Sequence, residues 1–226
     1  REAYAAANQL DPTRLWITLM PGSRRKEVRM NLPTILDAAN RLETGLLDRG
    51  YEFLLPVART LEASFLRELI QSATETQRAA SLQKSIHLVP EALPALFHSR
   101  AAIVASGTAT VEAALMGTPF VMVYRVAPLT YALGKPRVKV PYFAMVNLIA
   151  GEQVVPELVQ HKFTTENIVV EMKQIIPEGE QRTRMIEGLA AVKARLKQAN
   201  GSDAHPSEIA ADIILRIGSS SDRVIG

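Results

Sequence analysis

The sequence predicts an α/β protein in which a doubly wound, mostly parallel sheet is followed by a helical C-terminal segment. Short, continuously apolar runs alternate with segments of helical periodicity between residues 15 and 125. Strands that are apolar throughout are typical of a parallel sheet covered on both faces, and right-handed crossovers between them give a Rossmann-like domain. We expect this domain over residues 1–160, helices over 161–217 that pack on it or on a partner domain or subunit, and a flexible tail over 218–226.

The expected elements follow one another in regular order. Apolar runs predict strands at residues 15–20, 51–57, 85–89, 101–105 and 119–125. Apolar residues at helical spacing predict helices at residues 61–77, 92–99, 108–116, 164–175, 178–198 and 207–217. The helix after the first strand should begin at Asn31, because Asn is a good N-cap and Pro33 suits a first turn. Residues 21–31 would then form a long, basic loop at the carboxyl end of that strand.

Composition excludes several kinds of site. The 226 residues contain no cysteine, which excludes disulfides and thiolate metal sites, and the four histidines lack metal-ligand spacing. The net charge of +3 is too small to indicate a nucleic-acid partner; an anionic ligand and an anionic membrane surface suit it equally well. No apolar run reaches the roughly twenty residues of a membrane-spanning helix. Because the chain begins with Arg1, we expect it to be part of a longer protein.

One stretch, residues 103–119, combines the end of a strand with the start of a helix. The turn Ser106-Gly107-Thr108 follows the apolar run directly. Gly107 permits a tight bend, and Ser106 and Thr108 are both suited to cap the helix. The free N–H groups and the positive end of the helix dipole would lie at the carboxyl edge of the sheet, where a phosphate is readily bound.

Glu112 adds a second kind of recognition to this stretch. It lies one helical turn beyond Thr108 and shares its face. No Ser or Thr stands three residues before it, so it is not the glutamate of a capping box. A carboxylate beside a phosphate site can accept hydrogen bonds from both hydroxyls of a ribose. The alternative is a solvated glutamate on a helix surface.

Three further candidates lie at or beyond other predicted strand ends. Gly22-Ser23-Arg24 combines a backbone turn with a guanidinium, whose planar fork of donors suits phosphate; the alternative is a surface loop. Arg125 ends the fifth strand, with a structural salt bridge as the alternative. Asn147 is a polar residue in an apolar run, with a turn-forming asparagine as the alternative.

Segment 128–143 mixes apolar and aromatic residues with three cations. Such a segment can lie on a bilayer surface or line a path for a lipid; the alternative is an ordinary connection with exposed lysines. The sequence has no Gly-x-Gly-x-x-Gly, Walker, Gly-x-Ser-x-Gly or kinase signature. Ser106 has no evident base, so hydrolysis by a Ser/His pair is not expected.

Several motifs occur together in a fixed order over residues 15–160. They are Leu19-Met20-Pro21-Gly22-Ser23-Arg24 with Glu27-Val28, Ala105-Ser106-Gly107-Thr108-Ala109-Thr110-Val111-Glu112, Tyr124-Arg125, Asn147-Leu148-Ile149-Ala150-Gly151 and Val154-Val155-Pro156-Glu157-Leu158. Together they resemble the lipid-A-disaccharide synthase family, inverting glycosyltransferases built from two Rossmann-like domains. The resemblance implies transfer of 2,3-diacylglucosamine from UDP to 2,3-diacylglucosamine 1-phosphate, which forms the β-1,6 disaccharide of lipid A and releases UDP.

The resemblance also implies where the nucleotide binds, since enzymes of this type hold it in the carboxyl-terminal domain. The implied UDP contacts are Gly22, Ser23, Arg24, Ser106, Gly107, Thr108, Thr110, Glu112, Arg125 and Asn147. Helix N–H groups and hydroxyls would stabilise charge on the departing diphosphate, so neither a metal nor another cofactor is expected. Two positions depart from the family pattern: Val146 stands where Pro is common, and Glu152 stands where Arg is common. The second departure puts a contact near Glu152 in doubt.

The family's amino-terminal half, with the acceptor site and the general base, is absent from this sequence. We therefore expect the 226 residues alone to bind UDP weakly and to catalyse no transfer. The resemblance implies a cytoplasmic, peripheral protein on the inner face of the bacterial inner membrane, and a homodimer that exchanges C-terminal segments. The alternatives are a UDP-N-acetylglucosamine epimerase, the peptidoglycan glucosaminyltransferase, or a non-catalytic nucleotide-binding or oligomerisation module. Segment 128–143 favours the lipid substrate.

Overall fold

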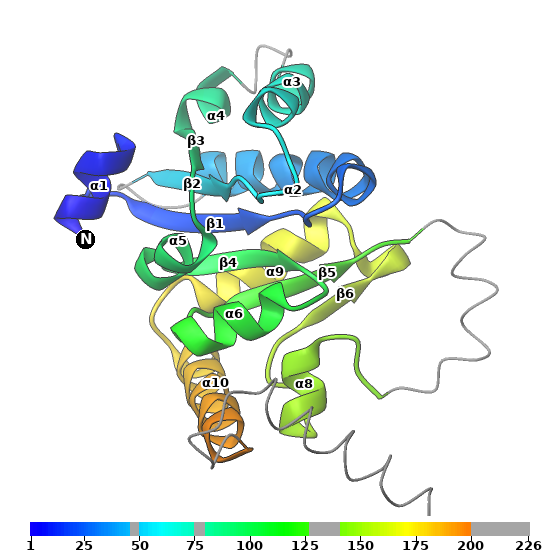
Figure 1. The fold of residues 1–226 in the computed structure, drawn as a ribbon. Helices are drawn as coiled ribbons and strands as arrows, with labels where there is room; N and C mark the ends of the chain where they lie inside the picture. Colours follow the sequence, from blue (N-terminus) through cyan, green and yellow to red (C-terminus); the bar gives the residue numbers. More distant parts are fainter. Residues whose placement is uncertain (46–49, 75–79, 127–140, 200–226) are drawn as a thin grey trace, which may run out of the picture. The chain divides into compact units, whose positions relative to one another are not determined.

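The computed structural model describes residues 1–45, 50–74, 80–126 and 141–199. Its sheet has six strands in the order β3-β2-β1-β4-β5-β6, and every neighbouring pair is parallel (Figure 1). The strands are β1 (Leu15–Met20), β2 (Tyr51–Pro56), β3 (Ile86–Val89), β4 (Ala101–Ala105), β5 (Phe120–Tyr124) and β6 (Glu157–Val159). The predicted parallel α/β fold is confirmed, and β6 is a strand that the apolar pattern did not indicate.

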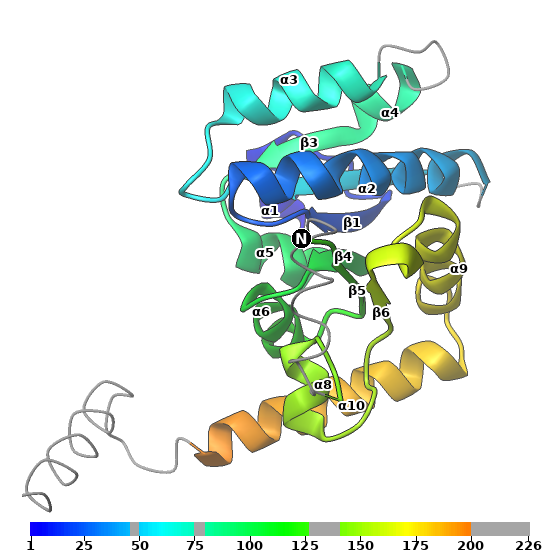
Figure 2. The same ribbon diagram turned by 90° about the vertical axis from the view of Figure 1, so that its right-hand side faces the viewer.

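Helices cover both faces of the sheet. The longer ones are α2 (Arg25–Gly45), α3 (Ala63–Thr74), α6 (Ala109–Met116), α9 (Thr165–Ile175) and α10 (Glu180–Ala199). The shorter ones are α1 (Glu2–Asn8), α4 (Ala80–Ser85), α5 (Ala92–His98), α8 (Met145–Ala150) and the 3₁₀ turn η2 (Gln160–Lys162). α2 and α9 pack together on one face, with α3 beside α2, whereas α5 and α6 lie on the other, with α8 against α6. Figure 2 shows α6 and α9 on opposite sides of β5.

The central strands β1 and β4 form the heart of the core. Trp16, Ile17 and Leu19 are fully buried, and every residue of β4 is buried. From β1 the chain continues outward to β2 and β3, whereas from β4 it continues in the other direction to β5 and β6. The connections therefore diverge between β1 and β4, and open α/β sheets bind ligands at the carboxyl ends of the strands at such a point.

The start of α2 differs from the prediction. The helix begins at Arg25 rather than at Asn31, so residues 25–31 are helical and Pro33 lies well inside the helix. Asn31 is no N-cap: its buried side-chain amide donates a 2.9 Å hydrogen bond to the carbonyl of Pro21. Val28 and Leu32 continue the buried stripe back toward the strand. Burial of that stripe outweighs the hydrogen bond that Pro33 cannot donate.

Some predictions fall on residues outside the described ranges. The expected helix at 207–217, the tail at 218–226 and most of segment 128–143 lie there. The chain divides into two compact units, residues 1–192 and 193–226, and the second is described only over the last turns of α10. The sheet and all features considered below belong to the first unit. Among the described helices, none combines the length and apolar character required to cross a membrane.

Candidate active site

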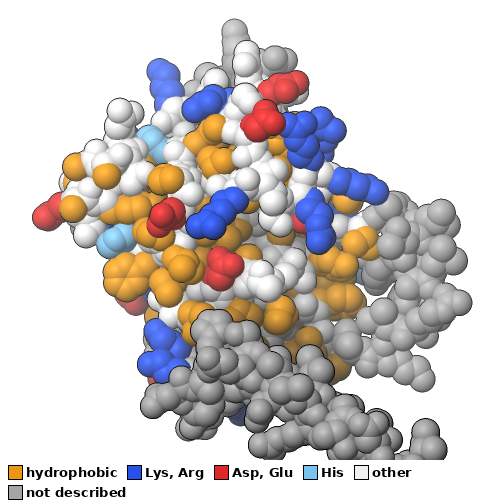
Figure 3. Space-filling model, in the orientation of Figure 1, with side chains coloured by type: hydrophobic (Ala, Val, Ile, Leu, Met, Phe, Trp, Pro, Cys, Tyr) orange, Lys and Arg blue, Asp and Glu red, His pale blue; other side chains and the backbone are white. Residues whose placement is uncertain are grey.

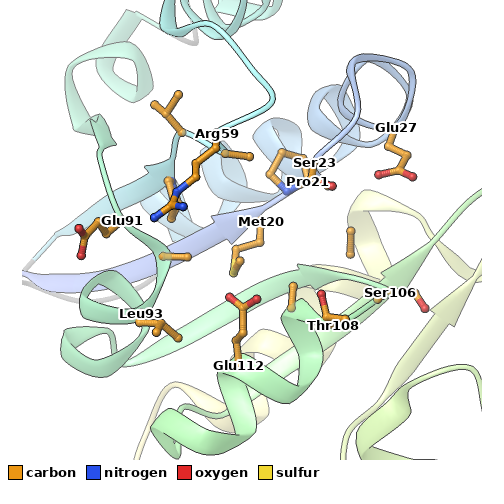
Figure 4. Close-up of a pocket in the computed structure, with 18 of the residues that line it drawn as sticks. Met20, Pro21, Ser23, Glu27, Arg59, Glu91, Leu93, Ser106, Thr108 and Glu112 are labelled. Carbon is orange, nitrogen blue, oxygen red and sulfur yellow. The ribbon is translucent and has the colours of Figure 1, made fainter. Parts of the chain in front are cut away.

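A cavity of about 640 Å³ opens at the carboxyl ends of the first four strands, where the connections of β1 and β4 diverge (Figure 4). Four segments contribute its lining, and each follows one strand. The lining residues are Met20 to Ser23 and Glu27 after β1, Pro56 to Arg59 after β2, Pro90 to Leu93 after β3, and Ala105 to Ala109 with Glu112 after β4. The sequence-predicted edge of the sheet is therefore the edge that carries the cavity.

The turn between β1 and α2 forms one wall. Gly22 has a φ of +124°, a conformation that favours glycine. A Cβ at this position would lie 2.8 Å from Oε2 of Glu27 and 2.9 Å from its Cβ, so a larger residue would collide with the first turn of α2. Because α2 begins at Arg25, the turn leads directly into a helix N-terminus, whose first N–H groups have no partner within the helix.

The turn between β4 and α6 forms the opposite wall. Gly107 has a φ of +145°, and a Cβ placed on it would meet no atom within 4 Å, so the backbone is open to the cavity here. The predicted capping by Ser106 and Thr108 is wrong. Thr108 occupies the N-cap position without a side-chain capping bond, and the Ser106 hydroxyl donates to the carbonyl of Phe143 at 3.1 Å. The Thr108 hydroxyl is exposed and has no hydrogen bond within the described residues.

Thr110 supports this turn from beneath instead of lining the cavity. Its hydroxyl is fully buried and donates a 2.8 Å hydrogen bond to the carbonyl of Gly107. The backbone N–H of Thr110 donates to the same carbonyl at 3.2 Å. Thr110 therefore fixes the shape of the bend, and its hydroxyl proton is committed to the Gly107 carbonyl.

Glu112 points from α6 into the cavity (Figure 4). Its backbone N–H donates to the carbonyl of Thr108 at 3.1 Å, which fixes the two residues one turn apart on the same face. The side chain is partly buried, and its carboxylate makes no hydrogen bond or ion pair with the described part of the chain. Its acceptor oxygens are free for a ligand.

Arg24 lies beside the cavity and is already paired. Its Nη1 donates to Oε1 of Glu27 at 3.0 Å, and the Arg24 side chain is 82% exposed. Glu27 lines the cavity, whereas Arg24 does not. A ligand phosphate would draw Arg24 inward only by competing with the carboxylate of Glu27.

Lys and Arg side chains gather around the start of α2 (Figure 3). Arg24, Arg25, Lys26 and Arg29 are all exposed there. The guanidinium groups of Arg25 and Arg29 lie 4.8 and 5.2 Å from the ring centre of Phe65, which holds them against α3. This cluster raises the positive potential at one side of the cavity mouth and favours the approach of anionic ligands.

Arg125, a predicted UDP contact, is not among the residues that line the cavity. Its guanidinium donates to the carbonyl of Phe163 and to the Thr34 hydroxyl at 3.3 Å, and it lies 4.3 Å from the ring centre of Phe163. Burial lowers the pKa of this guanidinium. Arg125 thus joins the end of β5 to α2 and to the segment before α9, which is a structural role.

Asn147, another predicted UDP contact, also lies outside the cavity lining. It is fully buried in α8. Its amide nitrogen donates to the carbonyl of Val155 at 2.9 Å and to Oε1 of Glu157 at 2.8 Å, and its Oδ1 accepts from the N–H groups of Val154 and Val155. These four bonds use the full capacity of the side chain. Asn147 therefore fastens α8 to the chain that leads into β6.

Sequence reasoning missed Arg59 and Glu91. Both are exposed residues of the cavity lining, in the segments that follow β2 and β3. No motif marks them. The signal that could have found them was the rule applied to the other strands: the carboxyl ends of neighbouring parallel strands meet at one edge.

A comparison with protein families places this geometry in context. The family model described as lipid-A-disaccharide synthetase matches residues 1–213. The chain belongs to the lipid-A-disaccharide synthase family. The lipid-A-disaccharide synthase of Acidobacterium capsulatum is 45% identical over 207 residues, which cover 89% of this chain and 50% of the relative. That of Koribacter versatilis is 43% identical over 222 residues, which cover 98% of this chain and 55% of the relative.

The chain thus spans about half the length of the curated family members it matches. Among solved structures, the α,α-trehalose 6-phosphate synthase of Burkholderia multivorans is similar with a TM-score of 0.54 and 12% identity, covering 86% of this chain and 42% of that one. The UDP-GlcNAc 2-epimerase of Neisseria meningitidis has a TM-score of 0.51 and 16% identity, covering 95% of this chain and 48% of that one. At such identities the likeness concerns the fold alone, and it agrees with a Rossmann-like domain.

Proposed function

We propose that this chain is the nucleotide-binding half of an inverting glycosyltransferase that transfers 2,3-diacylglucosamine from UDP to 2,3-diacylglucosamine 1-phosphate. Membership of the lipid-A-disaccharide synthase family supports the reaction. The observation that carries the nucleotide assignment is the uncommitted carboxylate of Glu112, which shares a cavity with two glycine turns that each lead into a helix.

In this proposal the diphosphate lies between the Gly22-Ser23 turn and the Gly107-Thr108 turn. The two walls present helix N-termini and the Ser23 and Thr108 hydroxyls to the same space. Backbone N–H groups at a helix start suit phosphate oxygens. Because these dipoles are fixed before the reaction, they stabilise the charge that accumulates on UDP as the sugar departs. Arg24 adds a cation if it exchanges Glu27 for phosphate.

The ribose lies against Glu112, whose carboxylate accepts hydrogen bonds from the 2′ and 3′ hydroxyls. The uracil ring then extends toward Leu93, which lies on the far side of Glu112 from Thr108 in the view of Figure 4, and toward Pro90, which also lines the cavity. Pro90 and Leu93 for the base, Glu112 for the ribose and the two helix N-termini for the diphosphate follow the order of groups in UDP.

The acceptor site and the general base belong, in this proposal, to the half of the family members that this chain does not span. The 226 residues should then bind UDP without transferring sugar. In the proposal, the exposed cations at the start of α2 would suit the anionic surface of the bacterial inner membrane.

The ribose contact is tested by calorimetric titration of UDP and 2′-deoxy-UDP into the chain and into Glu112→Ala. Loss of the carboxylate should weaken UDP binding about tenfold or more, because hydrogen bonds to a charged group are the stronger kind. Loss of the 2′ hydroxyl should weaken binding to the unchanged chain but have little further effect in Glu112→Ala, since the two changes remove one interaction. Glu68→Ala, an exposed glutamate on α3, is the matched control and should bind UDP normally.

Three results would contradict the proposal. Failure of the unchanged chain to bind UDP at millimolar concentration would remove the nucleotide assignment. Equal UDP affinity of Glu112→Ala and Glu68→Ala would remove the ribose contact. An undiminished penalty for 2′-deoxy-UDP in Glu112→Ala would place the ribose elsewhere.

A further inference from the structure

Acidic side chains outnumber basic ones among the described residues that line the cavity. Three of them are the carboxylates of Glu27, Glu91 and Glu112, and Arg59 is the one cation in the lining that the structure describes. A nucleoside diphosphate is itself strongly anionic, so its phosphates would be repelled by these carboxylates unless a cation stood close by. The lining therefore points to Arg59 as the group that compensates the charge of such a ligand.

Arg59 is also uncommitted. Its side chain is exposed and has no hydrogen bond or ion pair with any described residue. Arg24 and Arg25 differ, since Arg24 pairs with Glu27 at 3.0 Å and Arg25 pairs with Glu62 at 3.4 Å, and Arg29 lies against the ring of Phe65. Binding through Arg59 would break no existing ion pair, whereas recruitment of Arg24 would.

The backbone that carries Arg59 is held in place. Arg59 lies in a turn closed by a 2.8 Å hydrogen bond from the N–H of Leu61 to the carbonyl of Ala58. The N–H of Val57 donates to the carbonyl of Val89 at 2.9 Å, which ties the turn to β3. The hydroxyl of the neighbouring Thr60 donates to the carbonyl of Ser23 in the turn between β1 and α2. The base of the side chain is therefore fixed relative to the Gly22-Ser23 turn, while its guanidinium remains free.

We propose that Arg59 binds the diphosphate of the nucleotide directly, as a second cation that reaches over the cavity from the end of β2. This inference rests on the proposed function. β2 is the direct neighbour of β1, and adjacent strands lie about 4.8 Å apart, so an arginine side chain easily spans to the Gly22-Ser23 turn. In Figure 4 the guanidinium of Arg59 is turned toward the side of the cavity on which Glu91 lies, so binding of the diphosphate requires it to swing toward Ser23. The planar fork of donors suits two phosphate oxygens at once.

A ligand series separates this role from the two other contacts that Arg59 could make, a stack on the base or an ion pair with Glu91. Uridine, UMP and UDP share the base and the ribose and differ only in phosphate. The dissociation constant of each is measured by calorimetry for the 226-residue chain, Arg59→Ala, Arg59→Lys and Arg67→Ala. Arg67 is an exposed arginine on α3 outside the lining, and Arg67→Ala is the matched control.

For Arg59→Ala we expect UDP to bind about ten times more weakly, given the strength of charge-assisted hydrogen bonds at a partly solvated site. UMP should lose less, and uridine should bind unchanged. Arg59→Lys should recover part of the UDP affinity because it keeps the charge but loses the fork. Raising the salt concentration should weaken UDP binding to the unchanged chain more steeply than to Arg59→Ala.

The outcomes separate the two levels of the proposal. If the unchanged chain binds no UDP, the proposed function fails and this inference fails with it. If the unchanged chain binds UDP and Arg59→Ala binds it equally well, the inference about Arg59 alone is wrong. Equal losses for uridine and UDP would assign Arg59 to the base, which also overturns it. A loss of UDP affinity in Arg67→Ala of the same size would show a general charge effect and would overturn it as well.

Discussion

Two groups of polar side chains in this protein differ in whether their hydrogen-bonding groups have partners within the protein. Around the cavity, Thr108, Glu112 and Arg59 have no hydrogen-bonding partner for their side chains within the described residues. In the network between α8 and β6, Asn147 uses all its hydrogen-bonding capacity, and the carboxylate of Glu157 accepts from the backbone N–H groups of Phe143 and Ala144 as well as from Asn147.

This difference distinguishes polar groups that are available to bind a ligand from polar groups that stabilise the fold. A buried polar group must be satisfied within the protein, since leaving it without a partner costs free energy. A polar group at a ligand site remains unsatisfied by protein and is solvated until the ligand arrives. Saturation, rather than residue type or position in a motif, thus distinguishes Asn147 from Glu112. Both residues belong to motifs of the same family, and only one of them faces the cavity.

The largest expected effect is a loss of stability when the hydrogen bonds around Asn147 are broken. Asn147→Ala would leave the N–H and the carbonyl of Val155 without partners in a buried site, whereas the N–H of Val154 would keep its hydrogen bond to the carbonyl of Glu152. The free energy of unfolding should fall by about 2 kcal/mol, because each unsatisfied buried group costs about 1 kcal/mol or more. Urea denaturation measures the change.

The control for that experiment is Asn167→Ala, an exposed asparagine whose side chain donates to the carbonyl of Lys162. It should cost less than about 1 kcal/mol. UDP affinity per folded molecule should be unchanged in Asn147→Ala. A loss of affinity without a loss of stability would return Asn147 to the nucleotide site and remove the distinction drawn above.

The fold was predictable because its signals are local. Each of the central strands is an apolar run in the sequence, and parallel strands place their carboxyl ends at one edge. That rule located the cavity wall at Gly22-Ser23 and at Ser106-Gly107-Thr108, as well as Glu112 one turn later. The local signals failed where tertiary burial overrode them, as at Asn31, whose side chain serves the Pro21 carbonyl while the helix extends back to Arg25.

Other parts of the site depend on contacts that no local pattern contains. The saturation of Asn147 requires residues 154–157 to return against α8. The contacts of Arg125 with Phe163 require the segment before α9 to lie beside the end of β5. Arg59 follows a strand without any motif around it, so only the assembled edge of the sheet reveals that it lines the cavity.

Effects of intermediate size are expected from substitution of two threonines, Thr108 and Thr110, at the N-terminus of α6. Thr110→Val removes the buried hydrogen bond to the carbonyl of Gly107 and should lower the free energy of unfolding by about 1 kcal/mol, with UDP affinity within about twofold of normal. Thr108→Val removes an uncommitted hydroxyl and should leave stability within about 0.5 kcal/mol. It should weaken UDP binding about fivefold through loss of a phosphate contact. Urea denaturation measures the stability of both variants, and calorimetry measures their UDP affinity. A loss of UDP affinity in Thr110→Val together with a loss of stability in Thr108→Val would contradict the distinction.

The smallest effect concerns His98, at the end of α5 remote from the cavity lining. Its ring lies 5.1 Å from that of Tyr4 and 6.3 Å from that of Trp16. Burial lowers the pKa of His98 below its ordinary value of 6.5, and the positive charge of Arg1 lowers it further. Between the two values the unfolded chain binds the proton and the folded chain does not, so stability should decline as the pH falls from 7 to 5.

His98→Gln should make that decline shallower, as measured by urea denaturation at pH 7, 6 and 5. Glu178→Gln is the control. The hydrogen bond from Arg100 lowers the pKa of Glu178, so the stability that this carboxylate contributes is present above its ordinary value of 4.5 and is lost only below it. Parallel stability profiles for His98→Gln and the unchanged chain between pH 7 and 5 would contradict the assignment. UDP affinity should show the same pH dependence in His98→Gln and in the unchanged chain, since His98 is held by packing and lies outside the cavity lining. A different pH dependence would mean that packed polar groups also influence the cavity.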